Sequence, residues 1–186
     1  PFFGAAFAWG FADSGGAMSP LGIAFHPDGA HVYISGGDGR NRLYVFGPGG
    51  GPADLPLAEY DEPLYDMLFD ADGLLWASTG GGPLLQLDPA TGVILASYGE
   101  KVTLGLAARP GSSELFVATA SGIHIFDTRT GVFTPFSSTR CDGIAVAPDG
   151  VLWGCAWPDG GHVLRFDARG QAEVVLELDD EAEGIA

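Results

Sequence analysis

A short pattern that recurs along the whole chain constrains the fold more than any other feature of the sequence. Each copy has an opening residue that is usually glycine, then apolar residues, then a turn rich in proline, aspartate or glycine. The copies occupy residues 22–29, 66–73, 105–112 and 143–150, and a further copy begins at Gly184. They start about 40 residues apart, which is typical of four-stranded propeller blades and not of helical repeats.

The residues that follow each copy of this pattern favour the same architecture. An aromatic residue follows each turn at a fixed position: Tyr33, Trp76, Phe116 and Trp153. A small residue stands two positions later: Ser35, Ser78, Ala118 and Cys155. A third strand then ends in turns that begin with Asp and end with Gly at residues 88–92, 127–131 and 167–170. Because such sheets are apolar on both faces, they must stack on one another around an axis, with the aromatic residues between consecutive sheets.

We therefore predict an all-β propeller without α-helices. The expected blades are residues 21–63, 64–103, 104–141 and 142–182, with residues 1–20 ending a preceding blade and residues 183–186 starting the next. This number of copies is smaller than a ring of about six to eight blades requires. The sequence thus predicts a fragment of such a ring, an open arc with apolar sheet faces exposed at both ends unless other copies or partners cover them.

Composition narrows the range of partners. The chain is acidic, with a formal net charge of −16, yet 46% of its residues are hydrophobic, which indicates a folded protein. The missing basic surface disfavours nucleic acid and anionic membranes, and no stretch is long enough to span a membrane. Cys141 and Cys155 are expected on neighbouring strands in diagonal positions, which favours two reduced thiols over a disulfide.

Several motifs resemble known propeller families. Residues 22–29 followed by residues 39–46 look like an NHL-type repeat, and residues 75–79 with 87–92 resemble streptogramin-lyase-like repeats. Residues 115–119 with 122–127 are similar to the propeller repeats of two-component sensor proteins, and gluconolactonase-like (senescence-marker) propellers belong to the same broad group. The resemblance implies a shared blade architecture, whereas the functions within this group differ.

The openings of the innermost strands are the first candidate for a site. In a propeller they converge on one end of the central channel, and here they carry Ser19, Asp66, Asp142 and Glu183. Asp66, Asp142 and Glu183 could hold Ca²⁺ or Mg²⁺, which take several oxygen ligands. The alternative is that these carboxylates are solvated charges at the channel rim or partners of backbone amides.

The enzyme families of this group imply residues that the sequence does not match. A gluconolactonase-like metal site would need asparagine at a strand opening, but Asn41, the only asparagine, is expected in a loop. A streptogramin-lyase-like site would need a histidine with an acidic partner at the channel. His26 and His31 instead flank a hairpin turn, and His124 and His162 are expected on third strands. We interpret all four as surface or strand histidines.

The sequence therefore favours a non-catalytic binding or scaffold module of a larger, secreted or periplasmic bacterial protein. Its partner would be a protein or a small molecule held by the channel-mouth loops, and the other blades or domains of a longer chain would be further partners. A divalent-metal-dependent lactonase- or lyase-like enzyme is one alternative. The ligand-sensing propeller of a membrane-bound regulator is another.

Overall fold

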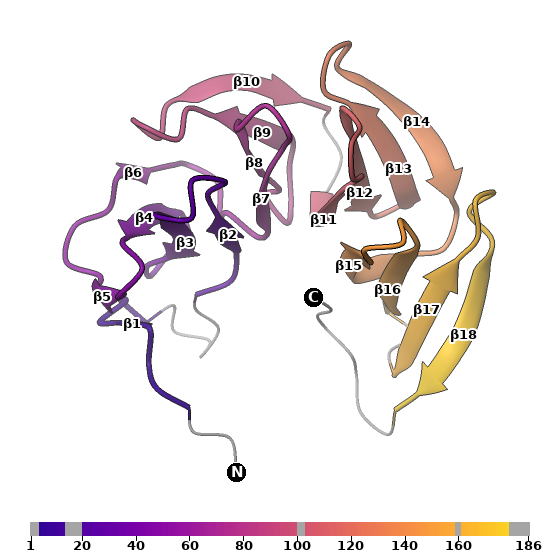
Figure 1. Cartoon of the computed structure of the whole chain (residues 1–186), viewed down its shortest axis with the longest axis horizontal. Helices are drawn as coiled ribbons and strands as arrows, with labels where there is room; N and C mark the ends of the chain where they lie inside the picture. The colour runs from indigo at the N-terminus through magenta and orange to yellow at the C-terminus, as the bar shows by residue number, and fades with distance from the viewer. Residues whose placement is uncertain (1–3, 14–19, 100–102, 159–160, 179–186) are drawn as a thin grey trace.

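Four antiparallel sheets follow one another around a single axis (Figure 1). The computed structural model describes residues 4–13, 20–99, 103–158 and 161–178. Blade 1 consists of β2 (Ile23–Phe25), β3 (Val32–Gly36), β4 (Arg42–Phe46) and β6 (Ala58–Glu59). Blade 2 consists of β7 (Met67–Phe69), β8 (Leu75–Ala77), β9 (Leu84–Leu87) and β10 (Ile94–Tyr98). Blade 3 consists of β11 (Thr103–Ala108), β12 (Glu114–Thr119), β13 (Gly122–Asp127) and β14 (Val132–Ser137). Blade 4 consists of β15 (Cys141–Val146), β16 (Leu152–Ala156), β17 (His162–Phe166) and β18 (Ala172–Glu177).

Within each blade the strands lie in chain order, from an innermost strand at the axis to an outer strand (Figure 1). This arrangement confirms the prediction of an all-β propeller with four-stranded blades, and no residue in the described part of the chain is helical. Accordingly, no described helix is long and apolar enough to cross a membrane.

The turns between third and fourth strands form as their residues predict. The carboxylates of Asp88, Asp127 and Asp167 accept the N–H two residues later at 2.8, 2.9 and 2.8 Å, which closes an Asx turn in each case. The glycines that end these turns all have positive φ angles: Gly92, Gly131 and Gly170. A side chain at these three positions would strain the backbone.

Each aromatic residue of the repeat packs toward the following blade where that blade is described. Tyr33 lies in a cluster with Met67 and Leu85 of blade 2, and Trp76, fully buried, packs with Leu106 of blade 3. Phe116 packs in the same way with residues of blade 4. Trp153 differs: it is only half-buried, because no described sheet covers the outer face of blade 4.

The turn glycines also set how closely blades approach. A Cβ at Gly92 would lie 2.5 Å from Cβ of Ala58 in blade 1, and one at Gly131 would lie 2.8 Å from the ring of Tyr98 in blade 2. A Cβ at Gly170 would overlap the carbonyl oxygen of Phe136 in blade 3. In all three interfaces, a turn of one blade thus sits directly on the outer strand of the preceding blade.

The first blade is covered where the sequence predicted an exposed sheet face. The N-terminal strand β1 (Ala8–Trp9) pairs in parallel with β5 (Gly51–Pro52). Phe7 and Phe11 pack beside it on the buried face formed by Val32, Ile34, Tyr44 and Phe46. Aromatic residues close to the N-terminus thus supply the apolar cover that this face needs. The first and fourth sheets share no described strand.

The two cysteines are unpaired and buried. Cys141 lies opposite Ala156 on the neighbouring strand, which puts Cys155 in the diagonal position that the sequence predicts. Burial raises the pKa of the Cys141 thiol to about 12, so this thiol is protonated and unreactive at neutral pH.

A pair of glycine substitutions in blade 4 tests the close approach of the blades. Gly150 and Gly170 have similar φ angles of 83° and 78°, but a Cβ at Gly150 meets open space. We expect Gly150→Ala to lower the free energy of unfolding by about 1–2 kcal/mol through backbone strain alone. Gly170→Ala should cost about 1–3 kcal/mol more, because its Cβ collides with the backbone at Phe136. Urea unfolding of both variants measures the difference, and equal losses would contradict close packing at this interface.

Candidate functional site

The openings of the innermost strands meet at one end of the channel, as the repeat predicts. A Cβ at Gly22 would lie 3.3 Å from Cα of Asp66, and a Cβ at Gly105 would lie 2.6 Å from the carbonyl oxygen of Asp142. At Gly105 the close approach of the neighbouring inner strand thus leaves no room for a side chain, and at Gly22 the space is tight. Asp66 and Asp142 stand at this end, directly before β7 and within β15.

Asp66 connects two blades. One carboxylate oxygen accepts the N–H of Leu106 in blade 3 at 2.7 Å, and the other accepts the N–H of Met67 at 2.8 Å. Its own N–H donates to Oγ of Ser78 at 3.1 Å. Ser78 is the small residue that follows the aromatic residue of this repeat by two positions. Burial raises the pKa of Asp66 to about 6 although both backbone amides act to lower it.

Asp142 has a partner from a more distant blade. The phenolic O–H of Tyr65, which precedes Asp66 in blade 2, donates to Oδ1 of Asp142 in blade 4 at 2.6 Å. This bond passes the opening of β11 and links blades that are not neighbours. Both described carboxylates of the predicted site are thus engaged by protein donors.

A three-carboxylate site would need a third ligand. Glu183, together with Ser19, lies outside the described residues. Among the residues that the structure does describe, Asp66 and Asp142 do not belong to any group of three side chains able to hold a metal ion. A Ca²⁺ or Mg²⁺ site at the channel mouth therefore stays a prediction.

The channel below these carboxylates is apolar. A cavity of about 540 Å³ is bounded by the inner strands of all four blades. Apart from Asp66, its lining is aliphatic: Leu21, Ile23, Leu68, Leu106, Ala107, Ala108, Ile144, Ala145 and Val146. Such a surface can bury an apolar group, and the one carboxylate can fix its orientation.

A second, smaller cavity of about 430 Å³ lies between the turns of blades 2 and 3. It is bordered by Asp70, which is itself buried and accepts the indole N–H of Trp76 at 2.7 Å. Oδ1 of Asp70 also accepts the N–H groups of Asp72 and Leu74. These bonds assign Asp70 to the stabilisation of its turn.

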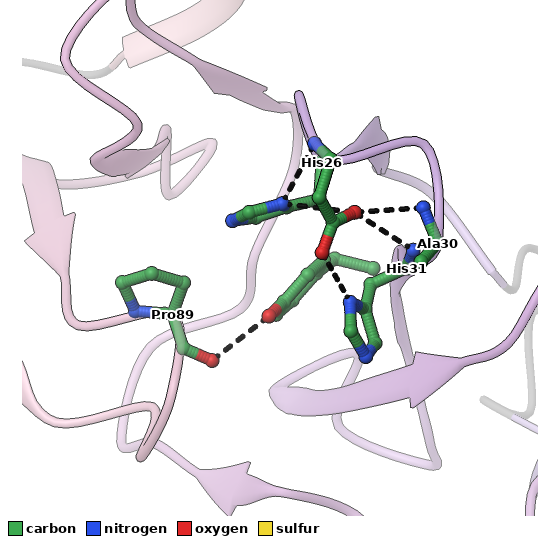
Figure 2. Close-up of polar contacts among 6 residues, drawn as sticks. His26, Ala30, His31 and Pro89 are labelled. Carbon is green, nitrogen blue, oxygen red and sulfur yellow. Dashed lines mark hydrogen bonds and ion pairs between the residues drawn. The ribbon is translucent and has the colours of Figure 1, made fainter.

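The hairpin turn of blade 1 gathers Asp28 with His26 and His31, two histidines that the sequence predicts as surface residues flanking the turn. Figure 2 shows the rings of His26 and His31 on either side of a carboxylate, that of Asp28. The His26 and His31 Nδ1 atoms lie 3.0 and 2.7 Å from the Asp28 oxygens. A backbone bond from Ala30 and the two imidazoles lower the pKa of Asp28 to about 2. The spacing His-x-Asp-x-x-His across a hairpin was the signal that could have marked this cluster.

Comparison with known proteins places the fold among several propellers. No protein-family model matches the sequence, and no curated protein matches it. The fold is similar to a gluconolactonase from Xanthomonas campestris, with a TM-score of 0.70 and 20% identity over 89% of this chain and 64% of that chain. It is also similar to an inactive variant of virginiamycin B lyase from Staphylococcus aureus, solved with quinupristin (TM-score 0.67, 18% identity, 90% and 59% coverage).

A third similar structure comes from a nidogen/laminin complex, with a TM-score of 0.73 and 16% identity over 89% of this chain and 67% of that chain. These neighbours confirm, at the level of the fold, the resemblance to gluconolactonase-like, streptogramin-lyase-like and NHL-type propellers. The chain spans about three fifths of the length of the lactonase and the lyase. The three similar structures range from enzymes to a component of a protein complex. The fold alone therefore does not indicate the function, and the residues of the site must be considered.

The buried carboxylate of Asp66 predicts a pH dependence of stability. The pKa of Asp66 is raised from 3.8 to about 6 in the folded protein, so the folded state holds this proton more tightly than the unfolded state. Below pH 4 protonated Asp66 makes its full contribution to the free energy of unfolding, roughly 3 kcal/mol. This contribution is lost as the pH rises through about 6. Asp66→Asn removes the titration. We therefore expect the unfolding free energy of the wild type minus that of the variant to fall between pH 4 and 7 in urea titrations. A constant difference would show that Asp66 titrates normally.

Proposed function

We propose that this chain is a non-catalytic binding propeller that receives an apolar group of a protein or small molecule at the channel mouth. The observation that carries the proposal is the open aliphatic cavity of about 540 Å³ that the inner strands line. Sites of this size with few polar groups are suited to binding, since apolar burial supplies affinity and isolated polar groups supply orientation.

The state of the channel carboxylates supports binding over catalysis. Asp66 accepts two backbone N–H groups and Asp142 accepts the phenolic O–H of Tyr65, so both serve as links between blades. A general base or a metal ligand needs a lone pair directed at its substrate or ion. Here these carboxylate contacts are used to position neighbouring strands.

A protein partner and a role within a larger secreted or periplasmic protein belong to the same proposal. The similarity to a propeller from a nidogen/laminin complex supports a protein ligand, because that structure contains this type of fold in a protein complex. The acidic surface further favours a partner whose contacting region is neutral or basic.

Two substitutions on one strand test the channel as a binding site. Ile23 lines the cavity and is 48% exposed, whereas Phe25, two residues further along β2, is 70% exposed and lies outside the lining. The neutral apolar dye Nile red serves as the probe in a fluorescence titration. We expect Ile23→Glu to weaken its binding at least about tenfold, because a carboxylate disfavours apolar ligands in the channel.

Phe25→Glu is the matched control and should leave dye binding unchanged. Because both side chains are already solvent-exposed, neither variant is expected to unfold the protein, and circular dichroism would verify this. No dye binding by the wild type, or equal effects of the two variants, would contradict the proposal.

A divalent-metal-dependent lactonase- or lyase-like enzyme is the second candidate, favoured by the fold similarity to a gluconolactonase and to virginiamycin B lyase. It requires a Ca²⁺, Mg²⁺ or Mn²⁺ ion at the carboxylates of the channel mouth. If the binding proposal holds, elemental analysis of the purified protein will find none of these ions at one per chain. A stoichiometric ion that is lost in the Asp142→Asn variant, together with hydrolysis of an aldonolactone, would establish the enzyme instead.

A further inference from the structure

The turn between β2 and β3 places three metal-binding side chains at one point. No two of the ligand atoms of His26, Asp28 and His31 are more than 4.8 Å apart. Around a zinc ion with bonds of 2.0–2.2 Å, tetrahedral ligand atoms are about 3.4 Å apart. The three groups are therefore close to the separation that one ion imposes, and the His31 side chain is half-exposed.

Two of the three groups are already fixed in position. Oδ1 of Asp28 accepts the N–H groups of Ala30 and His31 at 2.7 and 3.2 Å, which holds the carboxylate over the turn. The ring of His26 packs edge-on against Phe69 of blade 2, with ring centroids 4.7 Å apart. Hydrogen bonds to a ligating carboxylate and packing of a ligating imidazole are the supports that metal sites in proteins use.

The histidines are not needed to form the hairpin. Every blade closes this turn with the same backbone bond, between His26 and His31, Asp70 and Leu74, Arg109 and Glu114, and Ala147 and Val151. In blade 3 the pair at these positions is an arginine and a glutamate, and in blade 4 it is two aliphatic residues. The turn thus folds with unrelated side chains. In blade 1 two imidazoles take these positions, and both contact the carboxylate of the Pro-Asp-Gly turn.

We propose that His26, Asp28 and His31 form a binding site for a divalent transition-metal ion such as Zn²⁺. Two imidazole nitrogens and one carboxylate suit Zn²⁺ and related ions, whereas Ca²⁺ and Mg²⁺ prefer oxygen ligands alone. Nδ1 of His31, which contacts Oδ2 of Asp28, binds the ion once its ring proton is carried on Nε2. Nδ1 of His26 accepts the N–H of Asp28 at 3.1 Å and binds the ion when this bond opens. Side-chain exposures of 26%, 37% and 50% leave at least one coordination position open to water or to a ligand from a partner.

This site is separate from the channel mouth. It follows the end of β2, whereas Asp66 precedes the start of β7, and the openings of the inner strands are neighbours at the other end. Failure of the binding function proposed for the channel would therefore leave the metal site untouched. Because His26 contacts Phe69, an ion here would also strengthen the contact between blades 1 and 2.

The test is calorimetric titration of the protein with Zn²⁺ in the presence of excess Mg²⁺, which occupies the many exposed carboxylates. We expect one Zn²⁺ per chain and a raised melting temperature. The double variant Asp28→Asn, His31→Ala should bind at least about tenfold more weakly. Asp149→Asn is the matched control, since Asp149 holds the equivalent turn of blade 4 through the N–H of Val151 without histidines, and its affinity should be unchanged.

Nuclear magnetic resonance of the four histidine rings gives a second readout. Zn²⁺ should shift the ring resonances of His26 and His31 and leave those of His124 and His162 in place. The same spectra show that each variant is folded. Undetectable Zn²⁺ binding, equal affinity in the double variant, or shifts confined to His124 and His162 would each overturn the proposal.

Discussion

The structure depends on the face-to-face packing of sheets that are apolar on both sides. Blades 1 to 3 each bury an aromatic residue against the next blade, as Trp76 does against Leu106. Blades 2 to 4 each place a turn on the outer strand of the blade before. A sheet that is apolar on both faces is not stable alone in water, so each blade depends on its neighbours. Even the N-terminal segment follows this constraint, because Phe7 and Phe11 cover the first face of blade 1.

The same packing decides what the channel can do. The inner strands pack very closely at their glycines, which brings the first residues of neighbouring repeats together. The polar groups that are buried there must find hydrogen-bond partners. Asp66 accepts the N–H of Leu106 in blade 3, and Asp142 accepts the phenolic O–H of Tyr65 in blade 2. The two carboxylates therefore link blades, and the cavity beside Asp66 is otherwise lined by aliphatic residues.

The loops away from the channel mouth tolerate more variation in their side chains. The hairpin between the first two strands of a blade is closed by backbone bonds, so its side chains vary from an ion pair to a pair of aliphatic residues. In blade 1 this freedom is used for two imidazoles and a carboxylate (Figure 2). A rigid repeat with variable turns allows a binding site to be added without changing the fold.

The amino-acid sequence by itself determined the blade architecture. The sheets were predicted by the repeat period, by the aromatic and small residues at fixed positions, and by the turns that begin with Asp and end with Gly. The hydrogen-bonding and steric preferences of these residues act within one blade. Only the tertiary structure decided which groups meet: the bond from Tyr65 to Asp142 joins residues of different blades, and His26 reaches Phe69 across a blade boundary. Strand pattern specifies the pairing within a sheet, whereas contacts between sheets depend on how closely whole blades pack. No local pattern encodes that distance.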